Sequence, residues 1–249
     1  MLSLFHIGIN KMSRVLCWFS CGDASAVAAK FALNKYGNKC EIIYCDTFAY
    51  EHPDNKRFFT DIERWLDRSI KVLKSDRYKD IRDVFEKTKF LRNRQGARCT
   101  TELKKNVRKK YQQADDIHIF GFTIEEKHRV DRFYKENPDV IAEFPLVDNH
   151  ITKSNCHNII RNAGIALPAM YVLGFHNNNC IGCVKGQKGY WNKIRIHFPD
   201  AFLYMAKLER ELNFALCGIF LDELSPDAGN YKLEPEIECG VLCISEDNP

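Results

Sequence analysis

The sequence predicts an α/β protein in which helices cover both faces of a parallel sheet, giving three layers, with a cysteine-bearing C-terminal appendage. Short, nearly continuous apolar stretches alternate with helical stretches of about ten to fifteen residues, a pattern typical of βαβ units. The segments at 20–25, 46–47 and 121–123 lie at or just past the ends of expected strands. Ligands of such sheets bind beyond the carboxyl ends of the strands, so these three segments are expected to form a site.

The first elements follow from local composition. A strand is expected at 14–19, because RVLCWF is almost entirely apolar and ends in a turn of small residues. The alanine-rich stretch 24–36 predicts a helix, and EIIYC at 41–45 predicts a second strand. An amphipathic helix at 53–67 and a weaker strand at 69–73 are expected to follow.

Two helices are then expected at 80–90 and 100–113, and IHIFGF at 117–122 predicts a fourth strand. These elements complete the alternation of strands and helices that is typical of a parallel sheet.

The chain is predicted to divide into an N-terminal extension at 1–13, a nucleotide-binding α/β domain at 14–147 and an appendage at 148–249. In the appendage, a threonine-capped helix is expected at 152–164 and another helix at 201–212. We expect the appendage to pack on the same domain, because no linker-like stretch separates the two.

The composition excludes some classes of protein. Hydrophobic residues make up 45% and charged residues 28%, which is ordinary for a globular protein in water. No run of about eighteen apolar residues occurs, so we expect a cytoplasmic protein without a membrane partner. The net charge of +4 suits a nucleotide or nucleic-acid ligand without requiring one.

The turn SCGDAS at 20–25 joins the first strand to the first helix. Such a turn offers unpaired backbone N–H groups at the positive end of the helix dipole, and Ser20 and Ser25 add hydroxyl donors. It either binds a phosphate or merely joins the two elements, with serine or aspartate as a helix cap. Neither GxxxxGK[ST] nor GxGxxG occurs in the chain, so the common phosphate-binding motifs are excluded.

The turn resembles the PP-loop, SGGxxS, of the ATP-pyrophosphatase (adenine nucleotide α-hydrolase-like) superfamily, and the chain is most similar to its phosphoadenylylsulfate (PAPS) reductase family. Further segments match that family in the same order: DT…YEHP…F at 46–58, CTTELK at 99–104, GFT…E…R at 121–129 and ECG at 238–240. The resemblance covers about residues 14–243 and indicates a phage- or mobile-element-type member. It implies a Rossmann-like PP-loop fold, an adenine nucleotide ligand (PAPS, APS or ATP) and a thioredoxin-like reductant as a partner.

The resemblance implies that the nucleotide is held by the turn, by the segments after two later strands and by two arginines. These residues are Ser20, Cys21, Gly22, Asp23, Ala24, Ser25, Asp46, Thr47, Arg98, Gly121, Phe122, Thr123 and Arg129. The turn departs from the family where Cys21 replaces a glycine and Asp23-Ala24 replaces the Lys-Asp of many members. Loss of the lysine removes a cation for phosphate, and it favours nucleotide binding over magnesium-assisted pyrophosphate release.

Several of the eleven cysteines indicate a metal centre. Cys180 and Cys183 form a CxxC knuckle, and Cys239 and Cys243 form a second pair, so zinc or a [4Fe–4S] cluster is expected. The adenylylsulfate branch of the resembled family holds a [4Fe–4S] cluster with a cysteine pair in its CCxxxK segment and a later CxxC. That likeness implies Cys99 as a further ligand, with the fourth supplied by Cys239 or Cys243.

Two roles compete for Cys239. The ECG match implies that its thiolate attacks the sulfate sulfur and forms an S-sulfo intermediate, whereas the pairing with Cys243 implies that it binds the metal. A ligated thiolate is a poor free nucleophile, so one role excludes the other.

Three functions remain open. The first is an adenine-nucleotide-binding enzyme resembling PAPS reductase, which acts on a sulfonucleotide or related adenylylated substrate and has an Fe–S centre. The second is a PP-loop Fe–S enzyme that uses ATP for sulfur transfer or nucleic-acid modification. The third is a non-catalytic nucleotide- or nucleic-acid-binding protein with a structural zinc.

Overall fold

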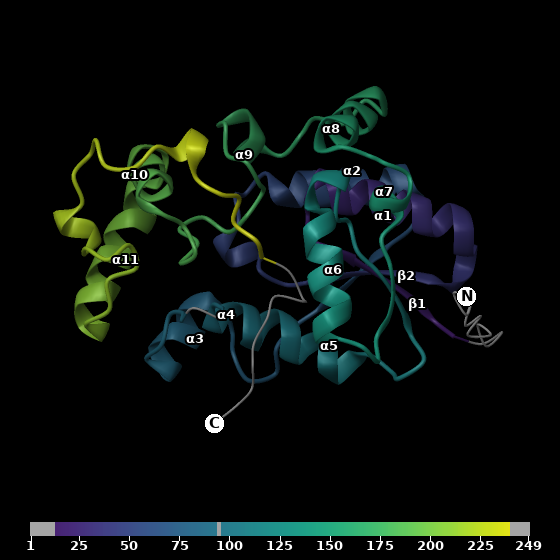
Figure 1. The fold of residues 1–249 in the computed structure, drawn as a ribbon, viewed down its shortest axis with the longest axis horizontal. Coiled ribbons are helices and arrows are strands. Elements are labelled where there is room, and N and C mark those ends of the chain that lie inside the picture. Colours follow the sequence, from purple (N-terminus) through teal and green to yellow (C-terminus); the bar gives the residue numbers. More distant parts are fainter. Residues whose placement is uncertain (1–12, 94–95, 240–249) are drawn as a thin grey trace, which may run out of the picture.

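The computed structural model describes residues 13–93 and 96–239, and within these ranges five strands form one sheet (Figure 1). All of their pairings are parallel, in the order β3-β2-β1-β4-β5. The strands are β1 (Val15–Phe19), β2 (Cys40–Cys45), β3 (Ile70–Leu73), β4 (Ile117–Ile119) and β5 (Ile141–Glu143). The α/β class predicted from the sequence is confirmed, and β5 is an addition to the four predicted strands.

The order of the strands reverses at β1. The chain moves from β1 to β2 and β3 on one side and then returns to the other side of β1 for β4 and β5. Val15 of β1 therefore pairs with Cys40 of β2 on one side and with Ile117 of β4 on the other. In an open parallel sheet the ligand crevice lies at this switch point, beyond the carboxyl ends of the strands. The fold thus places a crevice between the turn after β1 and the segment after β4.

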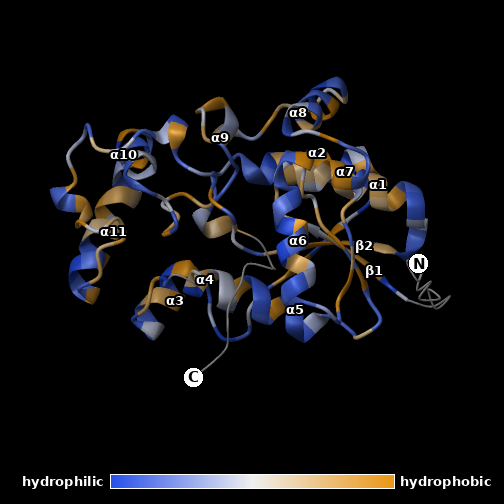
Figure 2. Cartoon of the chain, in the orientation of Figure 1, coloured by the Kyte–Doolittle hydropathy of each residue, from blue (hydrophilic) through white to orange (hydrophobic). Residues whose placement is uncertain are grey.

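Helices cover both faces of the sheet, because the side chains of each strand alternate between the faces. In β1, Val15, Cys17 and Phe19 join the core under α1 and α2, whereas Leu16 and Trp18 join the core under α5 and α6. β1 and β2 are mostly apolar along their length for this reason (Figure 2). These helices are α1 (Asp23–Tyr36), α2 (Asn55–Leu66), α5 (Asn106–Tyr111) and α6 (Lys127–Glu136).

α1 is alanine-rich because it is buried on two sides. One side packs on the sheet, and the other packs against α7 (Pro145–Asp148) and α8 (Lys153–Asn162). Small side chains such as Ala28, which is fully buried, let these layers approach closely. α8 begins after Thr152, whose hydroxyl accepts a hydrogen bond from a backbone N–H of the first turn at 3.0 Å, so the predicted cap is confirmed.

A second apolar core lies beside the sheet. Leu91 and Leu103 belong to this core together with Trp191 and Phe202. The appendage predicted at 148–249 therefore shares its core with residues that precede it. The helices that contribute to this core are α3 (Ile81–Thr88), α4 (Arg98–Thr100), α9 (Ala169–Val172), α10 (Lys188–His197) and α11 (Pro199–Leu212).

Some predicted elements differ from those of the structure. The helix expected at 100–113 consists of α4, a π-helical turn (Thr101–Lys105) and α5. The strand expected at 117–122 ends at Ile119. The helices α6 and α10 were not predicted, because most residues of α6 are charged and the first turn of α10 contains a glycine. Within the described part of the chain, no helix is long and apolar enough to cross a membrane.

Candidate functional site

A large cavity lies at the switch point of the sheet and extends toward the second core. Its volume is about 580 Å³. Ser20 and Gly22 of the first turn and Gly121 after β4 line one part of it, and Cys99 and Cys180 line another part. The structure thus brings the predicted phosphate loop and the predicted cysteine ligands, which are far apart in the sequence, to the same cavity.

The turn after β1 has a left-handed residue where the resembled loop has glycine. Cys21 has a φ of 59°, a conformation that costs a non-glycine residue roughly 1–2 kcal/mol. Its thiol is buried, with Sγ 3.4 Å from the carbonyl oxygen of Asn55. Ser25 Oγ accepts a hydrogen bond from Ser20 N at 3.0 Å and donates one to Gly22 O at 2.9 Å. The backbone therefore has the shape that favours glycine, although the residue is cysteine.

α1 begins at this turn without a side-chain cap from the described residues, and Gly22 is its N-cap. The first backbone N–H groups of a helix have no acceptor within the helix, and the helix dipole places partial positive charge on them. Here they belong to the same turn whose residues Gly22, Ala24 and Ser25 line the cavity. Such an arrangement is suited to binding a phosphate.

Gly121 allows the end of β4 to approach the start of α1. A Cβ atom at this position would lie 2.6 Å from Ser25 Cα and 2.8 Å from Ser25 N. Gly121→Ala is therefore expected to lower the free energy of unfolding by about 1–3 kcal/mol, measured by urea denaturation.

Gly164→Asn is the control for this substitution. A Cβ atom at Gly164 meets nothing within 4 Å, and asparagine tolerates the left-handed conformation of this residue, whose φ is 75°. The control is expected to unfold at nearly the wild-type urea concentration. A Gly121→Ala protein as stable as this control would contradict the close approach of β4 and α1.

The structure divides the residues predicted to bind the nucleotide into two groups. The cavity is lined by Ser20, Gly22, Ala24, Ser25, Thr47, Gly121, Phe122 and Arg129. Its wall does not include Cys21, Asp23, Asp46, Arg98 or Thr123. Asp46 lies 3.4 Å from Lys74 Nζ, and Arg98 pairs with Glu102 at 2.8 Å. A role of this second group in nucleotide binding stays a prediction.

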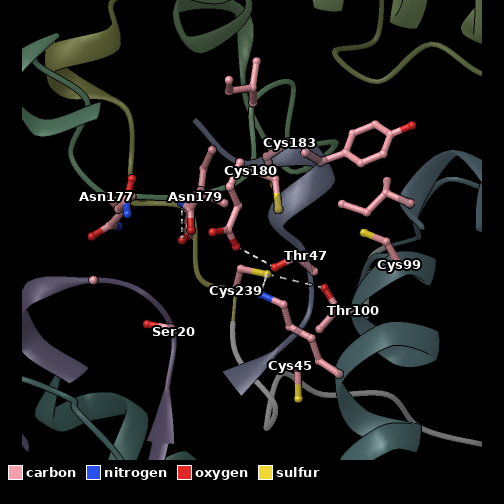
Figure 3. A pocket seen from close by; sticks show the side chains of 18 of the residues that line it. Ser20, Cys45, Thr47, Cys99, Thr100, Asn177, Asn179, Cys180, Cys183 and Cys239 are labelled. Carbon is pink, nitrogen blue, oxygen red and sulfur yellow. Dashed lines mark hydrogen bonds between the residues drawn. The ribbon is translucent and has the colours of Figure 1, made fainter. Parts of the chain in front are cut away.

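Five cysteines line the cavity: Cys45 at the end of β2, and four candidate ligands from three other segments (Figure 3). Cys99 belongs to α4, Cys180 and Cys183 to the loop before α10, and Cys239 to the C-terminal segment. Burial and the charge of the Cys239 thiolate raise the pKa of Cys99 to about 12, and burial also raises the pKa values of Cys180 and Cys183. Neutral buried thiols of this kind are unreactive until a metal or a positive charge favours the thiolate. Cys243, also predicted as a ligand, lies outside the described residues.

Cys239 differs from the other three because two hydrogen-bonding groups approach its sulfur. Thr100 Oγ1 lies 3.6 Å and Lys104 Nζ lies 3.7 Å from Cys239 Sγ (Figure 3). Burial by itself would raise the pKa of Cys239, but the positive charges of Lys104 and Lys185 and the two hydrogen bonds lower the pKa to about 7. A large share of Cys239 is therefore in the nucleophilic thiolate form near neutral pH.

Lys104 lies between anionic groups that stabilise its charge. Burial opposes the charged form, but the thiolate of Cys239 and the carboxylate of Glu51 raise the pKa of Lys104 well above its usual range. Glu51 is buried and accepts hydrogen bonds from Thr47 Oγ1 at 2.5 Å and from Asn55 Nδ2 at 2.7 Å. These bonds fix the carboxylate, so the ammonium of Lys104 stays charged beside Cys239.

The segment that carries Cys239 is held by contacts of its neighbour Glu238. The carboxylate of Glu238 pairs with Arg132 of α6 and lies 3.8 Å from Arg129 Nε, and its carbonyl oxygen accepts a hydrogen bond from Lys185 Nζ at 2.8 Å. Arg129, predicted to bind the nucleotide, therefore faces Glu238 as well as lining the cavity. These contacts fix the position of Cys239 in the cavity wall.

The donors at this end of the cavity suit a soft metal centre. Among the side chains that the structure describes, no group of three or more His, Cys, Asp or Glu residues is arranged as around a single metal ion. The four thiols nevertheless line one cavity, and Lys104 and Lys185 provide positive charge that would offset thiolates. In a [4Fe–4S] cluster each of the four thiolates binds a different iron, so the ligands surround a larger volume than the ligands of one ion.

The cavity also includes residues to which the sequence assigned no role. Glu51 and Lys104 lie within the matched motifs, and their position beside Cys239 depends on the fold. Lys153 and Tyr171 line the cavity beside the first turn, from α8 and α9. In the sequence, Lys153 is a charged residue directly after the helix cap Thr152. This pattern is common in helices of any function, so it did not identify Lys153 as a site residue.

No family model matches the chain, and no curated protein matches it. Membership of the PAPS reductase family therefore stays a prediction from the order of the motifs, whereas the α/β fold with a parallel sheet is shown by the structure.

Proposed function

We propose that this protein is an adenine-nucleotide-binding enzyme, similar to PAPS reductase, that acts on a sulfonucleotide or related adenylylated substrate and has an iron–sulfur centre. The observation that carries the proposal is the shared cavity, because the candidate phosphate loop and four cysteines line the same space. A nucleotide held at the loop would extend its phosphate-linked group toward the cysteines.

The nucleotide part of the proposal is supported by the position and the walls of the cavity. It lies at the switch point, where α/β sheets bind their ligands, and the uncapped start of α1 offers backbone N–H donors to a phosphate. Trp18, Phe120 and Phe122 are among the residues that line the cavity, and they contribute apolar surface of the kind that a purine base requires.

The metal part of the proposal is supported by three thiols that burial keeps neutral in the absence of a metal. Cys99, Cys180 and Cys183 would hold the cluster, since a metal makes thiolates of such groups. When bound, the cluster supplies redox-active iron beside the substrate.

Cys239 is then the reacting thiol, because Lys104 and Thr100 approach its sulfur and favour its thiolate. In the reaction that the resemblance implies, the Cys239 thiolate attacks the sulfur of the sulfonucleotide. A sulfur–sulfur bond forms, the bond from sulfur to the phosphate oxygen breaks, and the nucleotide leaves with the electron pair. One thiol of a thioredoxin-like dithiol then attacks Cys239 Sγ and displaces sulfite, and its second thiol frees Cys239 and leaves the reductant as a disulfide.

Metal analysis tests the cluster. Protein purified without oxygen is expected to contain iron and acid-labile sulfide, and Cys180→Ala is expected to lose most of both, because one thiolate ligand is missing. Cys217→Ala is the matched control, since this thiol lies outside the cavity wall with Sγ 3.7 Å from Gly186 O. Zinc without iron in the wild type, or a full metal load in Cys180→Ala, would contradict the metal part of the proposal.

The product released from different nucleotides tests the reaction. Sulfite release from PAPS or APS with a thioredoxin-like reductant is the expected result. Pyrophosphate release from ATP would instead identify the alternative PP-loop enzyme of sulfur transfer or nucleic-acid modification. The structure of the turn does not favour this ATP-dependent alternative. Its carboxylate, Asp23, lies outside the cavity wall and pairs with Lys153 at 2.6 Å.

A further inference from the structure

A cluster of charged and polar side chains lies beside the first turn of α1. Lys153 Nζ donates hydrogen bonds to Asp23 Oδ1 at 2.6 Å and to Tyr171 Oη at 2.9 Å, and the Tyr171 hydroxyl donates to Asp23 Oδ1 at 2.7 Å. His157 Nε2 lies 3.2 Å from Asp23 Oδ2, although not in the geometry of a hydrogen bond. Three elements, α1, α8 and α9, thus meet at one buried carboxylate.

The members of this cluster have different access to the cavity. Asp23 is fully buried and is not part of the cavity wall, whereas Lys153 and Tyr171 line it. An unpaired carboxylate at this place would repel a phosphate bound at the turn. Because Asp23 is paired with Lys153, its charge is neutralised and the ammonium is held beside the turn.

Lys153 has a donor to spare for a ligand. An ammonium group has three N–H bonds, and two of them are used by Asp23 and Tyr171. The third N–H bond has no hydrogen-bond acceptor among the described residues. The side chain of Lys153 is 27% exposed. Tyr171 Oη would lie 3.3 Å from a Cβ atom at Gly22, so the hydroxyl that Lys153 contacts lies directly beside the turn.

We infer that Lys153, held in place by Asp23, supplies the cation for the phosphate group of the nucleotide that the turn itself lacks. This inference rests on the proposed function, because it names the phosphate contact of the same site. Burial opposes the charge of Lys153, but the nearby Tyr171 and Asp23 raise its pKa, so the ammonium persists at neutral pH. The charge thus comes from α8, 130 positions after Asp23 in the chain, and not from the turn.

The decisive variant removes both charges of the pair. Lys153→Met alone would leave the buried carboxylate of Asp23 unpaired and destabilise the protein, so Asp23→Asn is combined with Lys153→Met. We expect this double variant to bind ATP and PAPS about 10- to 100-fold more weakly than the wild type, as for the loss of one charged hydrogen bond. Its affinity for adenosine, which has no phosphate, is expected to stay unchanged in titration calorimetry.

Lys30→Met is the matched control. Lys30 lies on α1, the helix that contains Asp23. Its Nζ donates a hydrogen bond to Trp65 O at 3.3 Å, and Lys30 is not part of the cavity wall. If the double variant binds ATP and PAPS with wild-type affinity, this inference alone is wrong. If its affinity for adenosine falls by the same factor as its affinity for ATP and PAPS, the role of the pair is purely structural and the inference is also wrong. A wild-type protein that binds none of the three ligands would overturn the proposed function itself.

Discussion

Cys239→Ser is expected to abolish sulfite release, lowering turnover of PAPS or APS by about 10³-fold or more. A serine hydroxyl does not ionise near neutral pH, so it cannot take the place of the attacking thiolate. The substitution changes one atom, and Thr100 and Lys104 remain able to contact the hydroxyl, so the cavity keeps its shape. Turnover is measured without oxygen, with a thioredoxin-like reductant, as sulfite formed.

The iron content of the same variant separates the two roles of Cys239. If Cys239 is the reacting thiol, Cys239→Ser retains the iron and sulfide of the wild type. If it loses iron as Cys180→Ala is expected to do, Cys239 is a ligand and the proposed reaction is wrong. Cys217→Ser is the control, because Cys217 lies outside the cavity wall and its substitution is expected to affect neither iron nor turnover.

Lys104→Met is expected to lower the reactivity of Cys239 at pH 7 by roughly 10- to 30-fold. The charge of Lys104 is the largest of the effects that lower the pKa of Cys239 to about 7, together with the charge of Lys185 and two hydrogen bonds, so about half of the thiol is ionised at that pH. Without this charge the pKa rises toward the ordinary value of about 8.5, where only about 3% is ionised at pH 7. The thiolate predominates above the pKa. The reactivity of Cys239 is therefore expected to rise as the pH passes through about 7 in the wild type, and only at higher pH in Lys104→Met.

The pH profile is measured as the rate at which iodoacetamide modifies Cys239, followed by mass spectrometry of the peptide, and as sulfite release. Lys104→Arg keeps the positive charge and is expected to restore much of the wild-type profile. Lys110→Met is the control, because Lys110 is exposed on α5 and pairs with Asp76 at 2.6 Å, away from the cavity. A Lys104→Met profile that coincides with that of the wild type would contradict the proposed role of Lys104.

The sequence predicted β1 and β2 well because each is a short apolar stretch buried on both faces of the sheet. RVLCWF contains β1 and EIIYC lies within β2, and the strand and the prediction agree to within one residue. β5 could not be predicted in this way, because it is a three-residue edge strand in which Ile141 is 38% exposed. An edge strand of this length is defined by its hydrogen bonds to β4 and not by an apolar pattern.

The site could be predicted in part because some of its features are local. The small residues after β1 and the CxxC spacing of Cys180 and Cys183 can be read directly from the sequence. The role of Asp23 was not visible in this way. A helix cap and a buried anchor for a lysine have the same sequence signature, and the structure shows that Gly22 is the N-cap while Asp23 pairs with Lys153.

By itself, therefore, the sequence determined the α/β class, the position of the turn at 20–25 and the CxxC knuckle, because these features depend on residues that are neighbours along the chain. Only the tertiary structure decided that the turn and the cysteines line one cavity, that Lys104 lies beside Cys239 and that Lys153 lies beside the turn. Lys104 and Cys239 are 135 positions apart, Lys153 and Asp23 are 130 positions apart, and the predicted cysteine ligands also lie far along the chain from the turn. Such contacts form only when segments that are distant in the sequence pack together, so no local pattern of residues encodes them.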